Sequence, residues 1–113
     1  MILNGGVHEG KRYLSEAVVR QMTSTQTGNL LNNGQNENGY GFGWSTTRRA
    51  HGERPPAVVG GCGHGGAYAT DLWVDPQRGL ITVFMVQHAG FPGPDGSKVR
   101  SAFNKAVADA LAK

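Results

Sequence analysis

The glycine-rich run at residues 60–66 constrains this chain more than any other feature. Five of its seven residues are glycine, and the other two are Cys62 and His64. Glycines beside a strand let another group approach the backbone closely, or leave backbone N–H groups open to a ligand. The imidazole of His64 is the chemically active side chain of the run. The run is therefore typical of one half of an active site.

An antiparallel hairpin is predicted directly after this run. The segments 67–74 and 80–87 are separated by an Asp-Pro-Gln-Arg-Gly turn, in which Pro76 presets the turn and Gly79 accepts a positive φ. Most residues of the second segment are apolar, which favours a strand that is covered on both faces.

Two helices and a third strand complete the predicted elements. Ser15 is a good N-cap, and it predicts a short helix over residues 16–23. Alternating glycine and aromatic residues at 40–46 predict a strand that another backbone or a ligand approaches closely. An amphipathic C-terminal helix is predicted by apolar residues at helical spacing, namely Val99, Phe103, Val107, Ala110 and Leu111.

These elements predict an α+β fold, in which a three-strand antiparallel meander carries the C-terminal helix packed on it. The segments 25–38, 47–57 and 90–96 are rich in polar residues, glycine or proline, and we expect them to be loops. A chain of 113 residues forms one compact unit at most.

Charge and hydropathy exclude several classes of function. Eleven basic and eight acidic residues give a net charge of +3. The basic residues form no stripe with interleaved aromatic residues, so no nucleic-acid partner is expected. No apolar stretch approaches the roughly 20 residues that cross a bilayer, and the apolar start at residues 1–3 is too short for a signal-peptide core. We therefore expect no membrane anchor and no signal peptide in this chain.

Cys62 and His64, together with His8, His51 and His88, raise the alternative of a zinc site. Cys-x-His alone is a weak signal, and the chain has neither CxxC nor HExxH, so we expect no metal and no cofactor. A second alternative is a reactive Cys62 thiol that His64 weakly activates. The single cysteine excludes an intramolecular disulfide.

The His-Gly-Gly-Ala motif at residues 64–67 resembles the third signature of the serine β-lactamase, penicillin-binding protein and carboxylesterase superfamily. That signature is K-[ST]-G in β-lactamases and H-x-G or H-G-G in many esterase-like members. The resemblance extends to residues 39–44 and 80–87, and it covers nearly the whole chain but only the C-terminal part of the family. It implies a partial β-lactamase/transpeptidase-like fold, with residues 1–113 as a single partial domain.

The resemblance also implies roles for five consecutive residues. His64 would orient or hydrogen-bond an acyl substrate, and Gly65 and Gly66 would let that substrate lie against the strand. The Ala67 N–H would be one of two oxyanion-hole donors, and Tyr68 would contact the substrate. The alternative for His64 is a partly exposed imidazole held by local backbone groups. For the glycines the alternative is tight packing or a bulge.

The nucleophile of the family has no counterpart here. It lies in an S-x-x-K motif, where the lysine helps to activate the serine hydroxyl. None of the five serines in this chain has lysine three residues on. The segment 13–15 matches the second signature, Y-x-[NS], but it precedes a helix and resembles a later region of the family, so we interpret the match as chance. We therefore expect the chain to be inactive alone.

Two functions remain open at this stage. The first is the C-terminal segment of a serine hydrolase that cleaves esters, β-lactams or amides through an acyl-enzyme. The second is a non-catalytic, self-associating assembly module. The expected partner is a second copy of the chain or a complementing N-terminal hydrolase segment, and an acyl substrate would bind only to the completed site. The family resemblance is compatible with the bacterial periplasm and with the cytoplasm.

Overall fold

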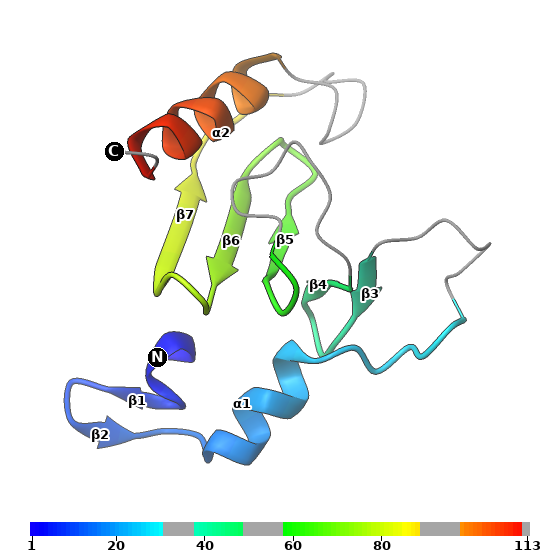
Figure 1. Cartoon of the computed structure of the whole chain (residues 1–113), viewed down its shortest axis with the longest axis vertical. Coiled ribbons are helices and arrows are strands. Elements are labelled where there is room, and N and C mark those ends of the chain that lie inside the picture. Colours follow the sequence, from blue (N-terminus) through cyan, green and yellow to red (C-terminus); the bar gives the residue numbers. More distant parts are fainter. Residues whose placement is uncertain (31–37, 49–57, 89–97, 112–113) are drawn as a thin grey trace.

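The computed structural model describes residues 1–30, 38–48, 58–88 and 98–111. Within them the predicted α+β class is confirmed, because two helices flank antiparallel strands (Figure 1). The helices are α1 (Glu16–Thr23) and α2 (Lys98–Leu111), and a short 3-10 helix η1 (Ile2–Asn4) precedes a small hairpin of β1 (Val7–His8) and β2 (Lys11–Arg12). The main sheet consists of β3 (Asn38–Tyr40), β4 (Ser45–Thr47), β5 (Cys62–Gly65), β6 (Asp71–Asp75) and β7 (Leu80–Phe84).

The main sheet is a meander, as predicted, but it has five described strands where the sequence predicted three. Each strand pairs antiparallel with the next in chain order. The single strand predicted over 40–46 is wrong, because β3 and β4 are separate strands joined by a tight reversal. There the Gly41 N–H donates to the Trp44 carbonyl at 2.7 Å, and Gly43 has φ of 78°. Gly43 thus serves the chain reversal, and the predicted close approach of another backbone occurs at Gly41.

Gly41 also meets the end of α1. A Cβ on Gly41 would collide with the backbone carbonyl of Met22, and the Phe42 N–H donates to that same carbonyl at 3.0 Å. Thr25, just after α1, bonds Thr46 of β4 through their hydroxyl groups, 2.7 Å apart. Helix α1 is therefore fastened to the sheet through the reversal between β3 and β4.

The predicted helix over 16–23 is confirmed to the residue. The Ser15 hydroxyl accepts the Val18 N–H at 3.2 Å, which satisfies one of the free donors at the start of α1. Val19 is the buried residue of this helix. A cavity of about 440 Å³ separates η1 and α1 from the sheet, and its lining includes Val19, Cys62 and Val74.

The predicted hairpin is confirmed. Its first strand, β6, begins at Asp71, and its second strand, β7, ends at Phe84. Asp75 is fully buried and holds the turn, because its carboxylate accepts the backbone N–H groups of Gln77 and Arg78. The Arg78 guanidinium adds a 2.8 Å bond to the same carboxylate. The fixed turn sets the register in which Trp73 lies opposite Thr82.

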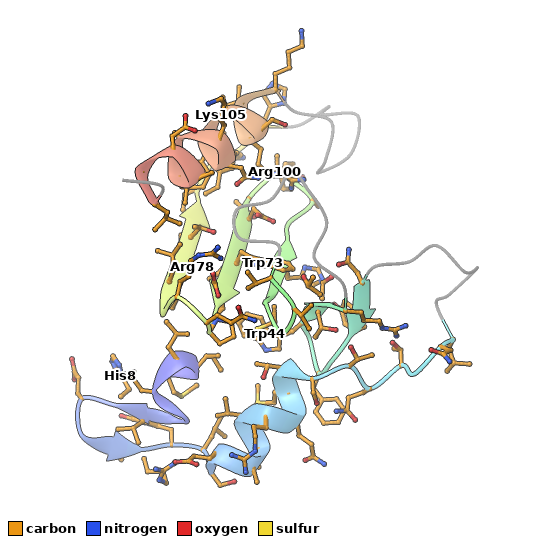
Figure 2. All side chains as sticks on the ribbon, in the orientation of Figure 1. His8, Trp44, Trp73, Arg78, Arg100 and Lys105 are labelled. Carbon is orange, nitrogen blue, oxygen red and sulfur yellow. The ribbon has the colours of Figure 1, made fainter. Side chains whose placement is uncertain are left out.

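Helix α2 packs on one face of the sheet, as the sequence predicted. The rings of Phe84 and Phe103 lie 5.3 Å apart, and Arg100 lies 3.7 Å from the Asp71 carboxylate. Both charged side chains are buried, and Figure 2 shows Arg100 between α2 and the sheet. Pairing places Asp71, Trp73 and Phe84 on this face.

The prediction that the second hairpin strand is covered on both faces is wrong for the described residues. Exposure alternates along it, and Ile81, Val83 and Met85 are 44%, 49% and 79% exposed. They lie on the face opposite α2, because α2 contacts the side that carries Phe84. An almost continuous apolar run therefore belongs here to a strand with one open face.

The predicted loops are only partly described. Residues 31–37, 49–57 and 89–97, and with them His51, lie outside the described residues. Neither α1 nor α2 is long and apolar enough to cross a bilayer.

Candidate active site

His64 lies in β5 on the face of the sheet opposite α2. Pairing puts it in one row with Leu72 of β6 and Val83 of β7. Its side chain is exposed, and its Nδ1 lies 2.6 Å from the Gly65 carbonyl oxygen. A carbonyl oxygen only accepts hydrogen bonds, so this contact requires the proton on Nδ1. In the neutral ring, Nε2 is then left as a hydrogen-bond and proton acceptor.

The aromatic ring of Tyr40 contacts the imidazole of His64. The rings of Tyr40 and His64 meet edge to face, with centroids 5.8 Å apart and planes at 85°. This arrangement suits the quadrupole of an aromatic ring. His64 is thus held by its neighbouring carbonyl and by an aromatic ring from β3, so the predicted local backbone contact is present but is not its sole support.

The Gly-Ala-Tyr-Ala segment after His64 is a turn, which corrects the strand predicted from residue 67. The Ala69 N–H donates to the Gly66 carbonyl at 3.0 Å, and the Gly66 N–H donates to the Thr70 carbonyl at 2.8 Å. Ala69 is buried with φ of 70°, a conformation that interrupts a strand. Strand β6 therefore begins at Asp71.

Ala67 is the second residue of this turn. Ala67 is exposed, and in the part of the chain that the structure describes its N–H has no hydrogen-bond acceptor. Tyr68 is exposed beside it, and the Tyr68 carbonyl accepts the His88 N–H at 3.2 Å. The turn is thus tied to the start of β6 on one side and to the segment after β7 on the other.

The glycines of the run serve different purposes. A Cβ on Gly63 would collide with the Leu72 carbonyl and the Trp73 ring, so glycine is required there for packing across β5 and β6. A Cβ on Gly66 would collide only with the Thr70 hydroxyl, which is the movable end of a side chain. Tight packing therefore explains the glycine at position 63. At position 66 a larger residue requires only that the Thr70 side chain move.

Cys62 is a buried thiol of low reactivity. It is 2% exposed, and burial raises its pKa from 9.0 to about 11. Because the thiolate is the nucleophilic form, a thiol with a raised pKa reacts slowly at neutral pH. The alternative of a Cys62 nucleophile activated by His64 is therefore disfavoured.

The zinc alternative gains no support from the described residues. No group of three His, Cys, Asp or Glu side chains comes together among them. His8 lies in β1, where it faces Glu9 at 3.9 Å, and His64 lies in the main sheet.

Three residues of the site are not singled out for it by the sequence, namely Tyr40, Thr70 and His88. The aromatic-glycine alternation around Tyr40 was the available signal. Thr70 and His88 act on the turn through a hydroxyl and a backbone N–H, and such contacts leave no residue-type pattern.

Comparison with known proteins agrees with the geometry. A family model described as Beta-lactamase matches residues 3–106, which is most of the 113-residue chain. A search among curated proteins finds no match. The resemblance to this family is thereby confirmed, and the chain belongs to the beta-lactamase family of serine hydrolase-related proteins.

Proposed function

We propose that this chain supplies the substrate-facing part of an acyl-transfer site that cleaves an ester, β-lactam or amide. The observation that carries the proposal is the N–H of the exposed Ala67, which has no hydrogen-bond acceptor among the described residues and lies three residues from the exposed imidazole of His64. A backbone N–H held outward by a fixed turn is the kind of donor that stabilises the oxyanion of an acyl-transfer intermediate.

In this proposal the turn provides one oxyanion donor without reorganisation. The Ala69 N–H bonds the carbonyl of the Gly66–Ala67 peptide, and further bonds to Thr70 and His88 hold the turn before any substrate arrives. Removal of one such donor from a hydrolase costs roughly 10²–10³ in kcat. Gly65 and Gly66 leave the backbone beside the donor open to the substrate, and Tyr68 lines its rim.

His64 would bind the substrate rather than attack it. Its Nδ1 proton is engaged with Gly65, so Nε2 carries the lone pair of the neutral ring. That nitrogen accepts a hydrogen bond from substrate or nucleophile, and in the protonated ring it donates one to a substrate oxygen. Tyr40 keeps the ring in this orientation.

The attacking hydroxyl would come from outside these 113 residues. No serine of the chain lies in S-x-x-K, and the second oxyanion donor in this family is the N–H of the nucleophilic serine. We therefore propose that the chain is a C-terminal hydrolase segment, inactive alone, that acts with a segment carrying S-x-x-K.

The test is reconstitution of activity. The chain is mixed or fused with an S-x-x-K segment from a beta-lactamase family member, and hydrolysis of p-nitrophenyl butyrate and a chromogenic cephalosporin is measured. Ala67→Pro removes the donor N–H at the second position of a turn, where proline is tolerated. Ala67→Ser keeps the N–H and serves as the matched control.

We expect Ala67→Pro to lower kcat by roughly 10²-fold or more, and Ala67→Ser to lower it little. His64→Ala should lower acyl transfer much more than it lowers folding stability, because the side chain is exposed. Equal activity of His64→Ala and the unmodified chain would reject the role of His64. Equal activity of the proline and serine variants would reject the oxyanion role of Ala67.

A further inference from the structure

Strand β7 ends the main sheet with an open edge. It is the last strand in the order from β3 to β7, and among the described strands it pairs with β6 alone (Figure 1). No strand pairs with its outer edge in the described ranges, which stop at residue 88 and resume at residue 98. An unpaired edge carries backbone donors and acceptors that bind another extended chain.

The sequence of β7 lacks the usual protection of such an edge. Natural edge strands avoid pairing through lysines, prolines, bulges or inward charges. Residues 80–87 contain no charged residue and no proline. Ile81 and Val83 project from the open face, and Met85 continues their row beyond the strand. Among the described residues the edge is therefore apolar as well as unpaired.

The pattern of β7 is self-complementary. When the strand pairs antiparallel with an identical strand so that Thr82 faces Thr82, Ile81 faces Val83 of the second copy, and Leu80 faces its Phe84. Paired residues project their side chains from the same face of the sheet. The exposed side chains of Ile81 and Val83 therefore meet those of Val83 and Ile81 in the second copy. No like charges face each other in this register.

We propose that this chain forms a two-fold dimer in which β7 pairs antiparallel with β7 of a second copy, centred on Thr82. The two five-stranded sheets then become one continuous sheet. A two-fold interface requires a patch that complements itself, and the symmetric apolar pattern about Thr82 meets that condition. This is why a second copy fits the edge without a partner of different sequence.

Helix α2 is placed to extend the contact. It crosses the C-terminal end of β7, and its own C-terminal end reaches beyond that strand in Figure 1. Leu111 closes the described part of α2 and is exposed. The inference stands independently of the proposed function, because it uses the open strand edge and not the His64 turn.

The register is tested with two double variants of the full chain. In Ile81→Lys/Val83→Lys, the proposed pairing brings lysine against lysine twice. In Ile81→Lys/Val83→Glu, the same pairing brings lysine against glutamate twice. Both pairs replace exposed side chains, so the monomer fold is retained, and circular dichroism checks this. Leu30→Lys, at a position 90% exposed and outside β7, is the control.

The molar mass in solution is measured by light scattering over a concentration series. We expect the unmodified chain and Leu30→Lys to give twice 12.0 kDa, the lysine pair to give a monomer, and the lysine-glutamate pair to regain the dimer. A monomeric unmodified chain at every concentration would overturn the proposal. So would a dimer of the lysine pair, or equal masses for the two folded double variants.

A cross-link keeps the proposal testable if a double variant fails to fold. The two-fold register places Thr82 beside its own copy, so Thr82→Cys should form a disulfide-linked dimer under a mild oxidant. Leu80→Cys is the matched control. In this register residue 80 faces Phe84 of the second copy, and residue 80 of that copy lies four positions away along the strand. Cross-linking of Leu80→Cys in preference to Thr82→Cys would contradict the register.

Discussion

The ring of Tyr40 on β3 meets the ring of His64 on β5 edge to face, at a centroid distance of 5.8 Å. Strand β4 lies between these two strands in the sheet, so the contact spans three strands. The aromatic ring thereby links the start of the main sheet to the imidazole, and the orientation of His64 depends on a residue 24 positions earlier in the chain.

Replacement of Tyr40 by leucine should free the imidazole. An edge-to-face aromatic pair contributes roughly 0.5–1.5 kcal/mol beyond its buried area, and Tyr40→Leu removes it. We expect the ring-current shifts of the His64 protons in NMR spectra to move toward exposed-histidine values. Tyr40→Phe keeps the ring and should leave those shifts nearly unchanged. Identical His64 spectra in both variants would show that the ring contact does not orient the imidazole.

Alanine at Gly63 should destabilise the protein far more than alanine at Gly66. The first substitution drives a Cβ into the Leu72 carbonyl and the Trp73 ring, whereas the second meets only the Thr70 hydroxyl. We expect a loss of about 1–3 kcal/mol or more for Gly63→Ala. Gly66→Ala should stay within about 1 kcal/mol of the unmodified chain. Urea unfolding measures both, and equal losses would contradict this division of the glycines.

Stability should fall with rising pH above pH 9 because of Cys62. The thiol has a pKa of 9.0 when unfolded and about 11 when buried in the fold. Between these values the unfolded chain has lost the proton and the folded chain retains it, so unfolding releases a proton. The contribution of the buried thiol is thus complete below pH 9 and is lost as pH rises toward 11, at about 1.4 kcal/mol per pH unit.

Cys62→Ala isolates this effect from the other groups that titrate in the same range. We expect the free energy of unfolding of the unmodified chain to fall more steeply than that of the variant between pH 9 and pH 11. Parallel curves for the two proteins would mean that the thiol is not desolvated in the fold.

The Asp75 turn should be the most sensitive polar position in the hairpin. Its fully buried carboxylate accepts two backbone N–H groups and the Arg78 guanidinium. Asp75→Ala leaves these donors without their acceptor, and we expect a loss of about 2–4 kcal/mol. Asp75→Asn keeps one carbonyl oxygen and should lose less. Thermal unfolding compares them, and an alanine variant as stable as the asparagine variant would contradict the role of the carboxylate.

The sequence predicted the elements whose signals are local. The Ser15 cap, the Asp-Pro-Gln-Arg-Gly turn and the helical spacing before Leu111 each lie within a few residues, and the structure confirms all three elements. The sequence does not predict β5, because three of its four residues are glycine or histidine and have little strand propensity. Pairing with β4 and β6 makes this segment a strand.

In the candidate site too, the sequence predicts the features with local signals and not those that depend on the fold. The motif at residues 64–67 was recognised from sequence, because the residue types themselves carry the chemistry. The contacts of Tyr40 and His88 were not, because they depend on which strands become neighbours. The exposed row of Ile81 and Val83 was misjudged for a related reason, since an apolar run does not reveal whether anything covers it.

The central claim is that the chain holds one half of an acyl-transfer site and lacks the attacking group. Hydrolysis of p-nitrophenyl butyrate and a chromogenic cephalosporin by the purified chain alone tests this most directly, with heat-denatured protein as the blank. The account predicts no turnover above the blank at any protein concentration. Turnover that copurifies with the chain and is abolished by replacing Cys62 or one of its serines would contradict it.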